Sequence, residues 1–353
     1  MMNLDNYERF TEIDPQNMLA EIENLPSQLK TAWELGKELD LPSWDGFDHI
    51  ILAGMGGSAI GADLLAAYTT PLCTLPIIVW RDYDLPAWAS GERTLVIASS
   101  HSGNTEETLS VFNQAVARKC RVMAIATGGS LAEASQSAGA ALWQFDHNGQ
   151  PRAAVGYSFG LLLAAINQLG LTPDPEEELL DAIEAMGTQQ IELDPKLPAA
   201  QNPAKRMAGQ FFGRWVGVFG SGILAPVARR WKTQISEISK AWAQFEFLPE
   251  ADHNTLAGII QPEELFAHSI MIFLDAHHSH PRNHLRSELT RKGFMLEGLN
   301  TDFYVAKGET RLANQWTALH FGDFTSFYLA MAYETDPTPV AAIQDLKAEM
   351  ASS

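Results

Sequence analysis

The fold is decided by the stretch His49-Ile-Ile-Leu-Ala-Gly-Met-Gly-Gly-Ser-Ala59. Its first five residues form a short apolar run that is typical of a buried strand, and a helical pattern follows the glycines as far as Tyr68. Glycines allow the backbone to approach an anion closely, and the start of a helix offers free N–H groups. A tight turn without a ligand would have the same pattern, and Ala59 also permits a weak match to a dinucleotide-binding fingerprint. This motif alone leaves all three interpretations open.

Further apolar runs extend the pattern along the first half of the chain. They predict buried strands at 75–80, 94–100, 121–127 and 141–145. Helical stretches begin near Thr105 and Ser130, and an amphipathic helix at 17–39, interrupted by Pro26, precedes the first strand. Strands that alternate with helices predict a parallel sheet with helices on both faces.

The same pattern starts again after a helical region at 153–206 that contains several prolines. The run 215–219 ends in Gly220-Ser221-Gly222, and a helix is predicted at 223–240. Later strands are expected at 241–247, 269–274 and 301–305, and later helices at 281–297, 311–333 and 339–350. The sequence therefore predicts two α/β lobes of similar topology, and such lobes bind ligands at the carboxyl ends of their strands or between them.

The composition restricts the classes of partner. The chain has 353 residues and a formal net charge of −19, from 24 basic and 43 acidic side chains. Such a surface repels nucleic acid and anionic membranes, so neither is an expected partner. The sequence contains 2 cysteines, no pattern of a signal peptide and no apolar run long enough to cross a membrane. These features predict a cytoplasmic protein.

The stretch Ser99-Ser-His-Ser-Gly-Asn-Thr-Glu-Glu-Thr108 follows a predicted strand and precedes a helix. Four hydroxyl groups, those of Ser99, Ser100, Ser102 and Thr105, surround a turn at Gly103. Hydroxyls and helix N–H groups suit a phosphate monoester. The alternative is a capped helix with Asn104 at the cap and Glu107 at its third position. Capping needs only one of these groups, so phosphate binding is the favoured interpretation.

This loop resembles that of SIS (sugar isomerase) domains, and further segments resemble the bifunctional phosphoglucose/phosphomannose isomerase family. These segments lie in the family's order over roughly residues 15 to 350. They are Gly54-Met-Gly-Gly-Ser58, Pro151-Arg-Ala-Ala154, Phe219-Gly-Ser-Gly-Ile-Leu-Ala-Pro226, Arg230-Trp-Lys-Thr-Gln-Ile-Ser-Glu237, His253-Asn254 and Asp336-Pro-Thr-Pro339.

The resemblance implies a fold and a division into domains. The fold would be α/β, with two SIS-type lobes that each contain a parallel sheet flanked by helices, in a three-layer, flavodoxin-like arrangement. The expected segments are an N-terminal helical segment at 1–45, a first SIS domain at 46–165, a helical linker at 166–205 and a second SIS domain with a C-terminal helix at 206–353.

The resemblance also implies site residues. Ser100, Ser102 and Thr105 would hold the substrate phosphate, and the turn formed by Gly56, Gly57 and Ser58 would line the sugar. Arg152 would stabilise an enediolate, Glu237 would be the base, His253 would open the sugar ring and Lys347 would assist. His253 would come from the neighbouring subunit, which implies a homodimer with shared active sites.

The chemistry of aldose–ketose exchange needs these residue types. It requires a carboxylate base, a fixed cation where negative charge develops on oxygen, and a proton donor to the ring oxygen. Without the resemblance, Glu237 would be an exposed helix acid paired with Lys240, Arg152 a surface cation and His253 an ordinary loop histidine.

The expected activity is therefore the reversible isomerisation of glucose 6-phosphate and mannose 6-phosphate to fructose 6-phosphate through a cis-enediol, without a metal or another cofactor. The alternatives are a non-catalytic SIS-type regulator that binds a sugar phosphate and, from the first glycine turn, a nucleotide-dependent oxidoreductase. The histidines at 277, 278, 280 and 284 suggest a metal site, but Asp275 is the only carboxylate near them in a recognised spacing. A polar loop is the preferred interpretation.

Overall fold

The computed structural model describes residues 3–352 and divides into two compact units, which we call the A unit and the B unit. The A unit comprises Asn24–Gly187 and Lys307–Trp316. The B unit comprises the chain up to Glu23, Thr188–Ala306 and the chain from Thr317 onward. The domain boundaries expected from the sequence stay a prediction.

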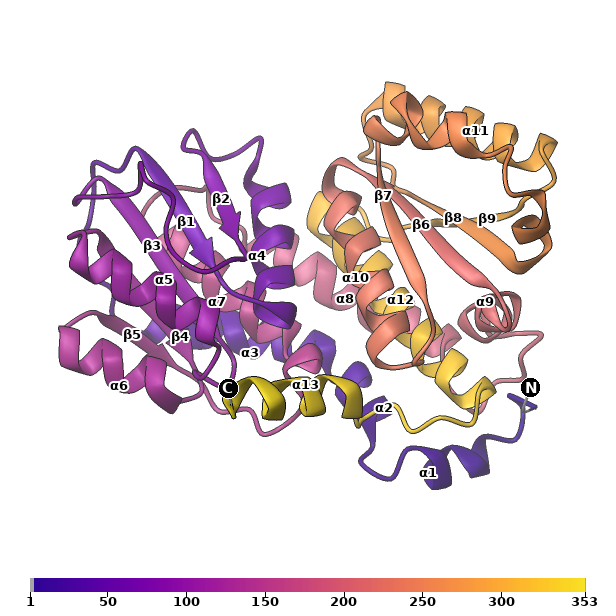
Figure 1. Ribbon diagram of the computed structural model, residues 1–353, viewed down its shortest axis with the longest axis horizontal. Helices are drawn as coiled ribbons and strands as arrows, with labels where there is room; N and C mark the ends of the chain where they lie inside the picture. The colour runs from indigo at the N-terminus through magenta and orange to yellow at the C-terminus, as the bar shows by residue number, and fades with distance from the viewer. Residues whose placement is uncertain (1–2, 353) are drawn as a thin grey trace. The chain divides into compact units, whose positions relative to one another are not determined.

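The A unit is built on a sheet of five parallel strands in the order β2-β1-β3-β4-β5 (Figure 1). The strands are β1 (His49–Ala53), β2 (Ile77–Trp80), β3 (Thr94–Ser100), β4 (Arg121–Ala126) and β5 (Ala141–Gln144). This is the flavodoxin-like order, and its topological switch point lies between β1 and β3. The register aligns Ala53 with Ala98 and Ser100 with Ala126.

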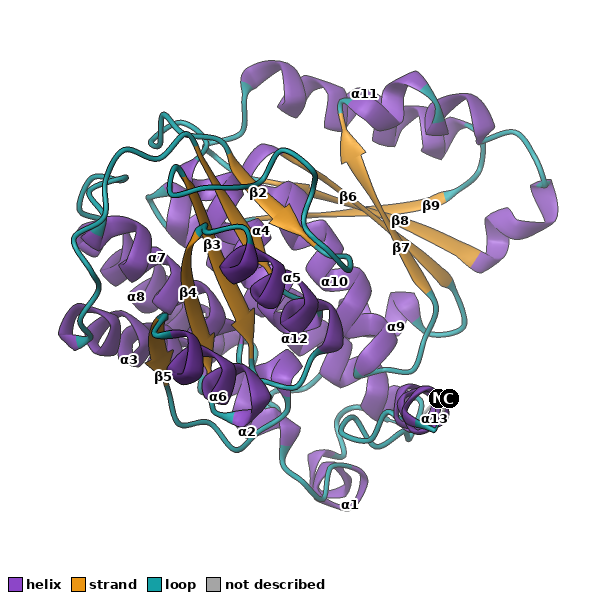
Figure 2. Ribbon diagram, turned by 60° about the vertical axis from the view of Figure 1, so that its left-hand side comes forward, coloured by secondary structure: helices purple, strands orange, loops and turns teal. Residues whose placement is uncertain are grey.

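Helices cover both faces of this sheet (Figure 2). On one face lie α5 (Glu106–Ala117) and α6 (Gly129–Ala138), whose Val111, Phe112 and Leu131 join the core formed by alternate residues of the strands. On the other face, α4 (Gly56–Thr69) packs against α7 (Val155–Gln168), which in turn packs against α3 (Leu25–Glu38). The central strands β1, β3 and β4 are buried on both faces, as a parallel sheet covered by helices requires.

The B unit repeats the topology with four parallel strands in the order β7-β6-β8-β9. The strands are β6 (Trp215–Ser221), β7 (Ala243–Leu248), β8 (Ser269–Asp275) and β9 (Asn300–Val305). Helix α11 (Pro281–Leu296) covers one face, where the rings of Phe219 and Phe273 stack and Phe294 packs against both, with ring centroids 4.7 to 6.0 Å apart. Helices α10 (Ala225–Glu237) and α12 (Arg311–Ala332) cover the other (Figure 1). The predicted α/β class and the duplicated topology are confirmed.

The remaining helices lie outside these two repeats. They are α1 (Phe10–Ile13), α2 (Met18–Glu23), α8 (Glu176–Glu192), α9 (Pro203–Phe211) and α13 (Ala341–Ala351). Short 3-10 turns also occur, among them η2 (Pro151–Ala153), η4 (Glu250–His253), η5 (Thr255–Gly258) and η6 (Glu263–His268). Within residues 3–352, every helix is too short or too polar to traverse a bilayer.

A buried histidine makes the stability of the B unit dependent on pH. His320 lies fully buried in α12, and its Nε2 lies 3.0 Å from the main-chain oxygen of Ile22. Burial lowers the pKa of His320 to about 4 from its ordinary value of 6.5. Between pH 6.5 and pH 4 the unfolded chain therefore binds a proton at His320 that the folded chain does not bind. The contribution of His320 to the free energy of unfolding is fully present above pH 6.5 and is lost as the pH falls toward 4.

We expect this one group to cost about 3 kcal/mol of unfolding free energy at pH 4 relative to neutral pH. His320→Gln keeps a hydrogen-bond donor for the main-chain oxygen of Ile22 but does not titrate. The slope of the unfolding free energy against pH should therefore be smaller in this variant, by the uptake of about one proton. Urea unfolding at several pH values between 4 and 7 measures this difference. Equal slopes in the two proteins would contradict the assignment.

Candidate active site at the carboxyl edge of the A sheet

The two glycine- and serine-rich turns meet at the switch point of the A sheet. The turn Gly54-Met55 joins β1 to α4, and residues 101–105 join β3 to α5. Since β1 and β3 are paired and parallel, both turns leave the sheet at its carboxyl edge. Open α/β sheets bind their ligands at this place, because the strand order reverses there and leaves a crevice.

Two hydroxyl groups of the second turn face each other, and a third lies on its exposed side. Ser100 Oγ lies 2.9 Å from Thr105 Oγ1 and accepts a hydrogen bond of 3.1 Å from the N–H group of Gly103. Ser102 Oγ accepts from the N–H group of Asn104 at 3.2 Å. Ser100 is buried, whereas the side chain of Ser102 is exposed. The turn therefore presents hydroxyls at the start of a helix, which is the arrangement that favours an anion.

The alternative of a simple helix cap is wrong. Thr105, not Asn104, is the N-cap residue of α5, and it makes no side-chain capping hydrogen bond. The side chain of Asn104 instead accepts from the N–H group of Ser130 at 3.0 Å and donates to the main-chain oxygen of Ser102 at 3.1 Å. The hydroxyl of Thr105 therefore makes no hydrogen bond to the free N–H groups at the start of α5.

A neighbouring loop holds this turn in place. After β4, the N–H group and the hydroxyl of Thr127 both donate to the main-chain oxygen of His101, at 3.1 and 2.7 Å. The N–H group of Leu131 donates to the oxygen of Gly103 at 2.8 Å. Gly103 has a φ of +69°, and a Cβ atom there would lie 1.8 Å from the oxygen of Gly128. Only glycine fits this position, and the hydrogen bonds from Thr127 and Leu131 join the turn to the neighbouring loop.

The first turn brings a guanidinium group to the same edge. A Cβ atom on Gly57 would lie 2.5 Å from the oxygen of Pro151 and 3.5 Å from the Cα atom of Arg152, so η2 packs directly on the start of α4. Arg152 is buried, and its Nη1 donates to Gln150 Oε1 at 3.4 Å. Ser58 is buried in the first turn of α4. A buried guanidinium group next to a helix start can stabilise negative charge on oxygen.

Two histidines that the sequence did not single out complete this edge. His101 Nε2 lies 2.9 Å from His147 Nδ1, and His147 lies against the ring of Tyr157. Burial, together with the neighbouring His147, lowers the pKa of His101 to about 4. His101 is therefore neutral at pH 7 and adds no charge to the serine-rich turn. Its position inside the serine-rich motif was visible in the sequence, but its partner was not.

The other predicted site residues belong to the B unit. Glu237 is the last residue of α10, which runs back from the turn after β6. Lys240 Nζ donates to the main-chain oxygens of Glu237 and Pro337, at 2.5 and 3.1 Å, and so closes the end of the helix. The sequence placed Glu237 at the far end of this helix, and the structure confirms that position.

His253 and Lys347 lie on two further elements of the B unit. His253 ends η4 and is exposed, whereas its neighbour Asp252 is fixed by Arg286 at 2.8 Å and Thr290 at 2.7 Å on α11. Lys347 is exposed on α13. The A unit thus brings Gly56, Gly57, Ser58, Ser100, Ser102, Thr105 and Arg152 to one edge, while Glu237, His253 and Lys347 occupy separate elements of the B unit.

The histidine-rich loop after β8 is held by local polar contacts. His284 Nδ1 contacts Asp275 Oδ2, and His280 Nδ1 accepts from the N–H group of Arg282 at 3.1 Å. Among residues 3–352, no three His, Cys, Asp or Glu side chains are grouped so that they could hold a metal ion.

Comparison with known proteins gives matches over nearly the whole chain. Residues 200–350 match the family described as the bacterial phospho-glucose isomerase C-terminal SIS domain. The chain is 37% identical over 339 residues to the bifunctional phosphoglucose/phosphomannose isomerase of Caldicellulosiruptor bescii, which covers 95% of this chain and 99% of that protein. It is 33% identical to the protein of that name from Aquifex aeolicus, over 88% and 92% of the two chains.

A solved structure shares the fold. The crystal structure of a glucose-6-phosphate isomerase like protein from Thermus thermophilus matches with a TM-score of 0.62 and 18% identity, over 96% of this chain and 99% of that one. Its likeness supports the two-sheet α/β architecture.

Proposed function

The chain belongs to the bifunctional phosphoglucose/phosphomannose isomerase family, and from this premise we propose how it acts. It interconverts glucose 6-phosphate and mannose 6-phosphate with fructose 6-phosphate through a cis-enediol. The observation that carries this conclusion is the hydroxyl-rich turn at the carboxyl edge of the A sheet, together with the buried Arg152 near Gly57 at the same edge. A non-catalytic regulator is not favoured, since the relatives that match over most of the chain are named isomerases.

We propose that Ser100, Ser102 and Thr105 bind the phosphate, because all three belong to the turn that leads into α5 and the hydroxyls of Ser100 and Thr105 face each other. Gly56, Gly57 and Ser58 line the sugar. These groups bind without a net positive charge, which lets an acidic protein hold a phosphate locally. Arg152, packed behind this turn, stabilises the oxygen that becomes negative in the enediolate.

Glu237 is the proposed base. Its carboxylate removes the proton from the C2 carbon of the open-chain aldose, and the electron pair moves toward the C1 oxygen to form the cis-enediolate. The hydroxyl proton on the C2 oxygen then moves to the C1 oxygen, the same carboxylate returns the abstracted proton to the C1 carbon, and the ketose results with its carbonyl group at C2. His253 donates a proton to the ring oxygen as the sugar opens, and Lys347 assists. The exchange moves a proton without net oxidation, so the proposal includes no metal ion or nucleotide.

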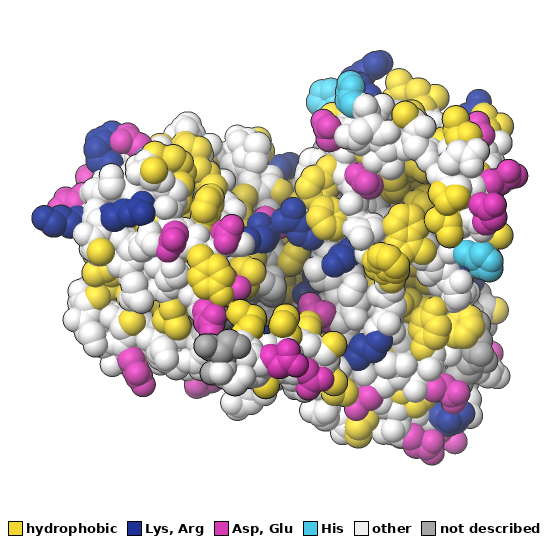
Figure 3. All heavy atoms as spheres, in the orientation of Figure 1, with side chains coloured by type: hydrophobic (Ala, Val, Ile, Leu, Met, Phe, Trp, Pro, Cys, Tyr) yellow, Lys and Arg dark blue, Asp and Glu magenta, His cyan; other side chains and the backbone are white. Residues whose placement is uncertain are grey.

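We further propose a homodimer in which His253 is supplied by the neighbouring subunit. The B unit exposes several large hydrophobic side chains, and Figure 3 shows hydrophobic groups gathered on its drawn face. Trp242 and Leu296 are 74% and 76% exposed. Apolar groups left in water over a wide area suit a surface that another chain covers. A cytoplasmic location is proposed on the two free cysteines, Cys73 and Cys120.

A proton-transfer assay tests the function directly. Fructose 6-phosphate is incubated with the protein in heavy water and a chelator, and deuterium is measured at the C2 carbon of each product. We expect incorporation in both glucose 6-phosphate and mannose 6-phosphate, since either face of the enediol can be protonated. Binding of fructose 6-phosphate without incorporation would instead support the regulator.

A further inference from the structure

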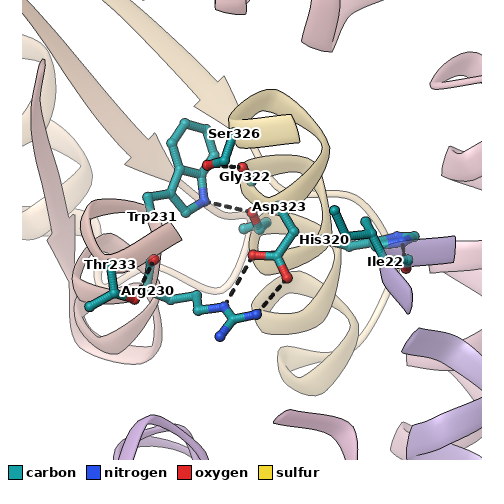
Figure 4. Close-up of polar contacts among 9 residues, drawn as sticks. Ile22, Arg230, Trp231, Thr233, His320, Gly322, Asp323 and Ser326 are labelled. Carbon is teal, nitrogen blue, oxygen red and sulfur yellow. Dashed lines mark hydrogen bonds and ion pairs between the residues drawn. The ribbon is translucent and has the colours of Figure 1, made fainter. Parts of the chain in front are cut away.

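Helix α10 is fixed to α12 by a buried ion pair (Figure 4). Arg230 Nε lies 3.1 Å from Asp323 Oδ1, and Arg230 Nη2 lies 2.8 Å from Asp323 Oδ2. The two side chains are only 2% and 4% exposed. The planar guanidinium group therefore meets the carboxylate through two parallel hydrogen bonds, which fixes the direction of both side chains.

Neighbouring contacts fix the position of α10 along α12. Trp231 Nε1 donates to the main-chain oxygen of Ala318 at 2.8 Å, and Ser239 Oγ donates to that of Ser326 at 2.6 Å (Figure 4 shows Trp231 and Ser326). Together with Asp323, these partners lie on successive turns of α12. Helix α10 is thus held at its middle and just beyond its end.

Gln234 extends this network toward the end of α10. It is buried and hydrogen-bonds to the carboxylate of Asp323. Residues three and four apart lie on the same side of a helix. Arg230, Gln234 and Glu237 have these spacings, so Glu237 lies on the same side of α10 as the two residues that contact Asp323.

The burial of this ion pair is weak evidence that its role is to stabilise the fold. Burial removes water from both charges at a large cost in free energy, so apolar residues of similar volume often give equal or greater stability than a buried ion pair. An apolar contact, however, lacks the two parallel hydrogen bonds that fix the direction of the guanidinium group and the carboxylate. We propose that Arg230, Asp323 and Gln234 form a positioning network that sets the rotation of α10 and so the direction of the Glu237 carboxylate. This inference rests on the proposed role of Glu237 as the base.

The double variant Arg230→Met/Asp323→Leu separates orientation from stability. We expect its unfolding midpoint to equal or exceed that of the natural protein, and KM to change less than twofold. We expect kcat to fall between about 10- and 100-fold, because a shift of about 1 Å at a reacting group has an effect of this size. A folded double variant with natural kcat would overturn the proposal.

A conservative variant keeps the test valid if the double variant does not fold. Arg230→Lys retains the charge but loses the fork, so kcat should fall with KM unchanged. Natural kcat in this variant would also overturn the proposal. The control is Lys205→Met, on α9 of the same unit, where Lys205 Nζ donates to the main-chain oxygens of Leu4, Pro195 and Leu197. Lys205→Met should lower stability and leave kcat unchanged. If kcat falls as much in Lys205→Met as in Arg230→Lys, the loss of kcat in both variants follows from lost stability, and the positioning role is contradicted.

A double-mutant cycle links the network to the base. In a Glu237→Gln background, the changes at Arg230 and Asp323 should lower kcat no further. A further fall of the same size would show that the network acts elsewhere and would overturn the proposal. Natural turnover in Glu237→Gln would overturn the base assignment itself, whereas natural turnover in the double variant alone would overturn only the positioning role.

Discussion

Glu237→Gln is expected to lower kcat by about 10³-fold in both the glucose and mannose 6-phosphate reactions. The amide has nearly the shape of the carboxylate but cannot accept the proton from the C2 carbon. KM should change only a few-fold, since the proposed phosphate groups belong to the A unit and are untouched. Steady-state kinetics with each substrate measure the effect, and deuterium incorporation from heavy water should fall in parallel.

The matched control is Glu288→Gln, a half-exposed acid on α11 of the same unit. It removes one negative charge without touching a proposed site residue, so its kcat should remain that of the natural protein. Equal activity of Glu237→Gln and Glu288→Gln would mean that another group takes the proton. A loss in Glu237→Gln confined to KM would assign the carboxylate to binding instead.

The elements of the fold could be predicted because their signals are local. Most of the β-strands are short apolar runs, and glycines at Gly54 and Gly222 mark the turns that follow β1 and β6. The predicted strands differ from the observed ones by two residues or fewer at either end, as at 75–80 against Ile77–Trp80. The turns η4 to η6 were missed, since short 3-10 segments have no hydrophobic period that marks them.

The contacts around the site could be predicted only in part, because most of them join distant residues. The hydroxyl groups of the serine-rich turn lie within ten residues of sequence, so their position in one turn could be predicted directly. Its support by Thr127 and Ser130, and the contact of His101 with His147, depend on how neighbouring strands align. Arg230 and Asp323 are 93 residues apart, and each alone resembles an ordinary charged residue of an amphipathic helix. Sequence spacing cannot show that two such charges are buried against each other.

Arg152→Lys should lower kcat by about 10²-fold while the protein remains folded. Lysine keeps the positive charge, but it lacks the planar fork that can donate two hydrogen bonds to adjacent oxygens. Arg152 is buried, and its backbone packs against Gly57. The backbone therefore has no room to shift and bring the shorter lysine side chain to the position of the guanidinium group. Arg152→Ala should lower kcat further. Both variants should still bind inorganic phosphate, because the hydroxyl loop is unchanged.

The control is Arg93→Lys, at an exposed ion pair with Asp48 near the opposite edge of the A sheet. An exposed pair of this kind contributes little, so both stability and kcat should match those of the natural protein. The decisive comparison is between substrate turnover and phosphate affinity, the latter measured by titration calorimetry. If Arg152→Lys loses phosphate affinity in proportion to kcat, the guanidinium group binds the phosphate in the ground state. If affinity holds while kcat falls, the group acts on the charge that develops during proton transfer, which is the outcome we expect.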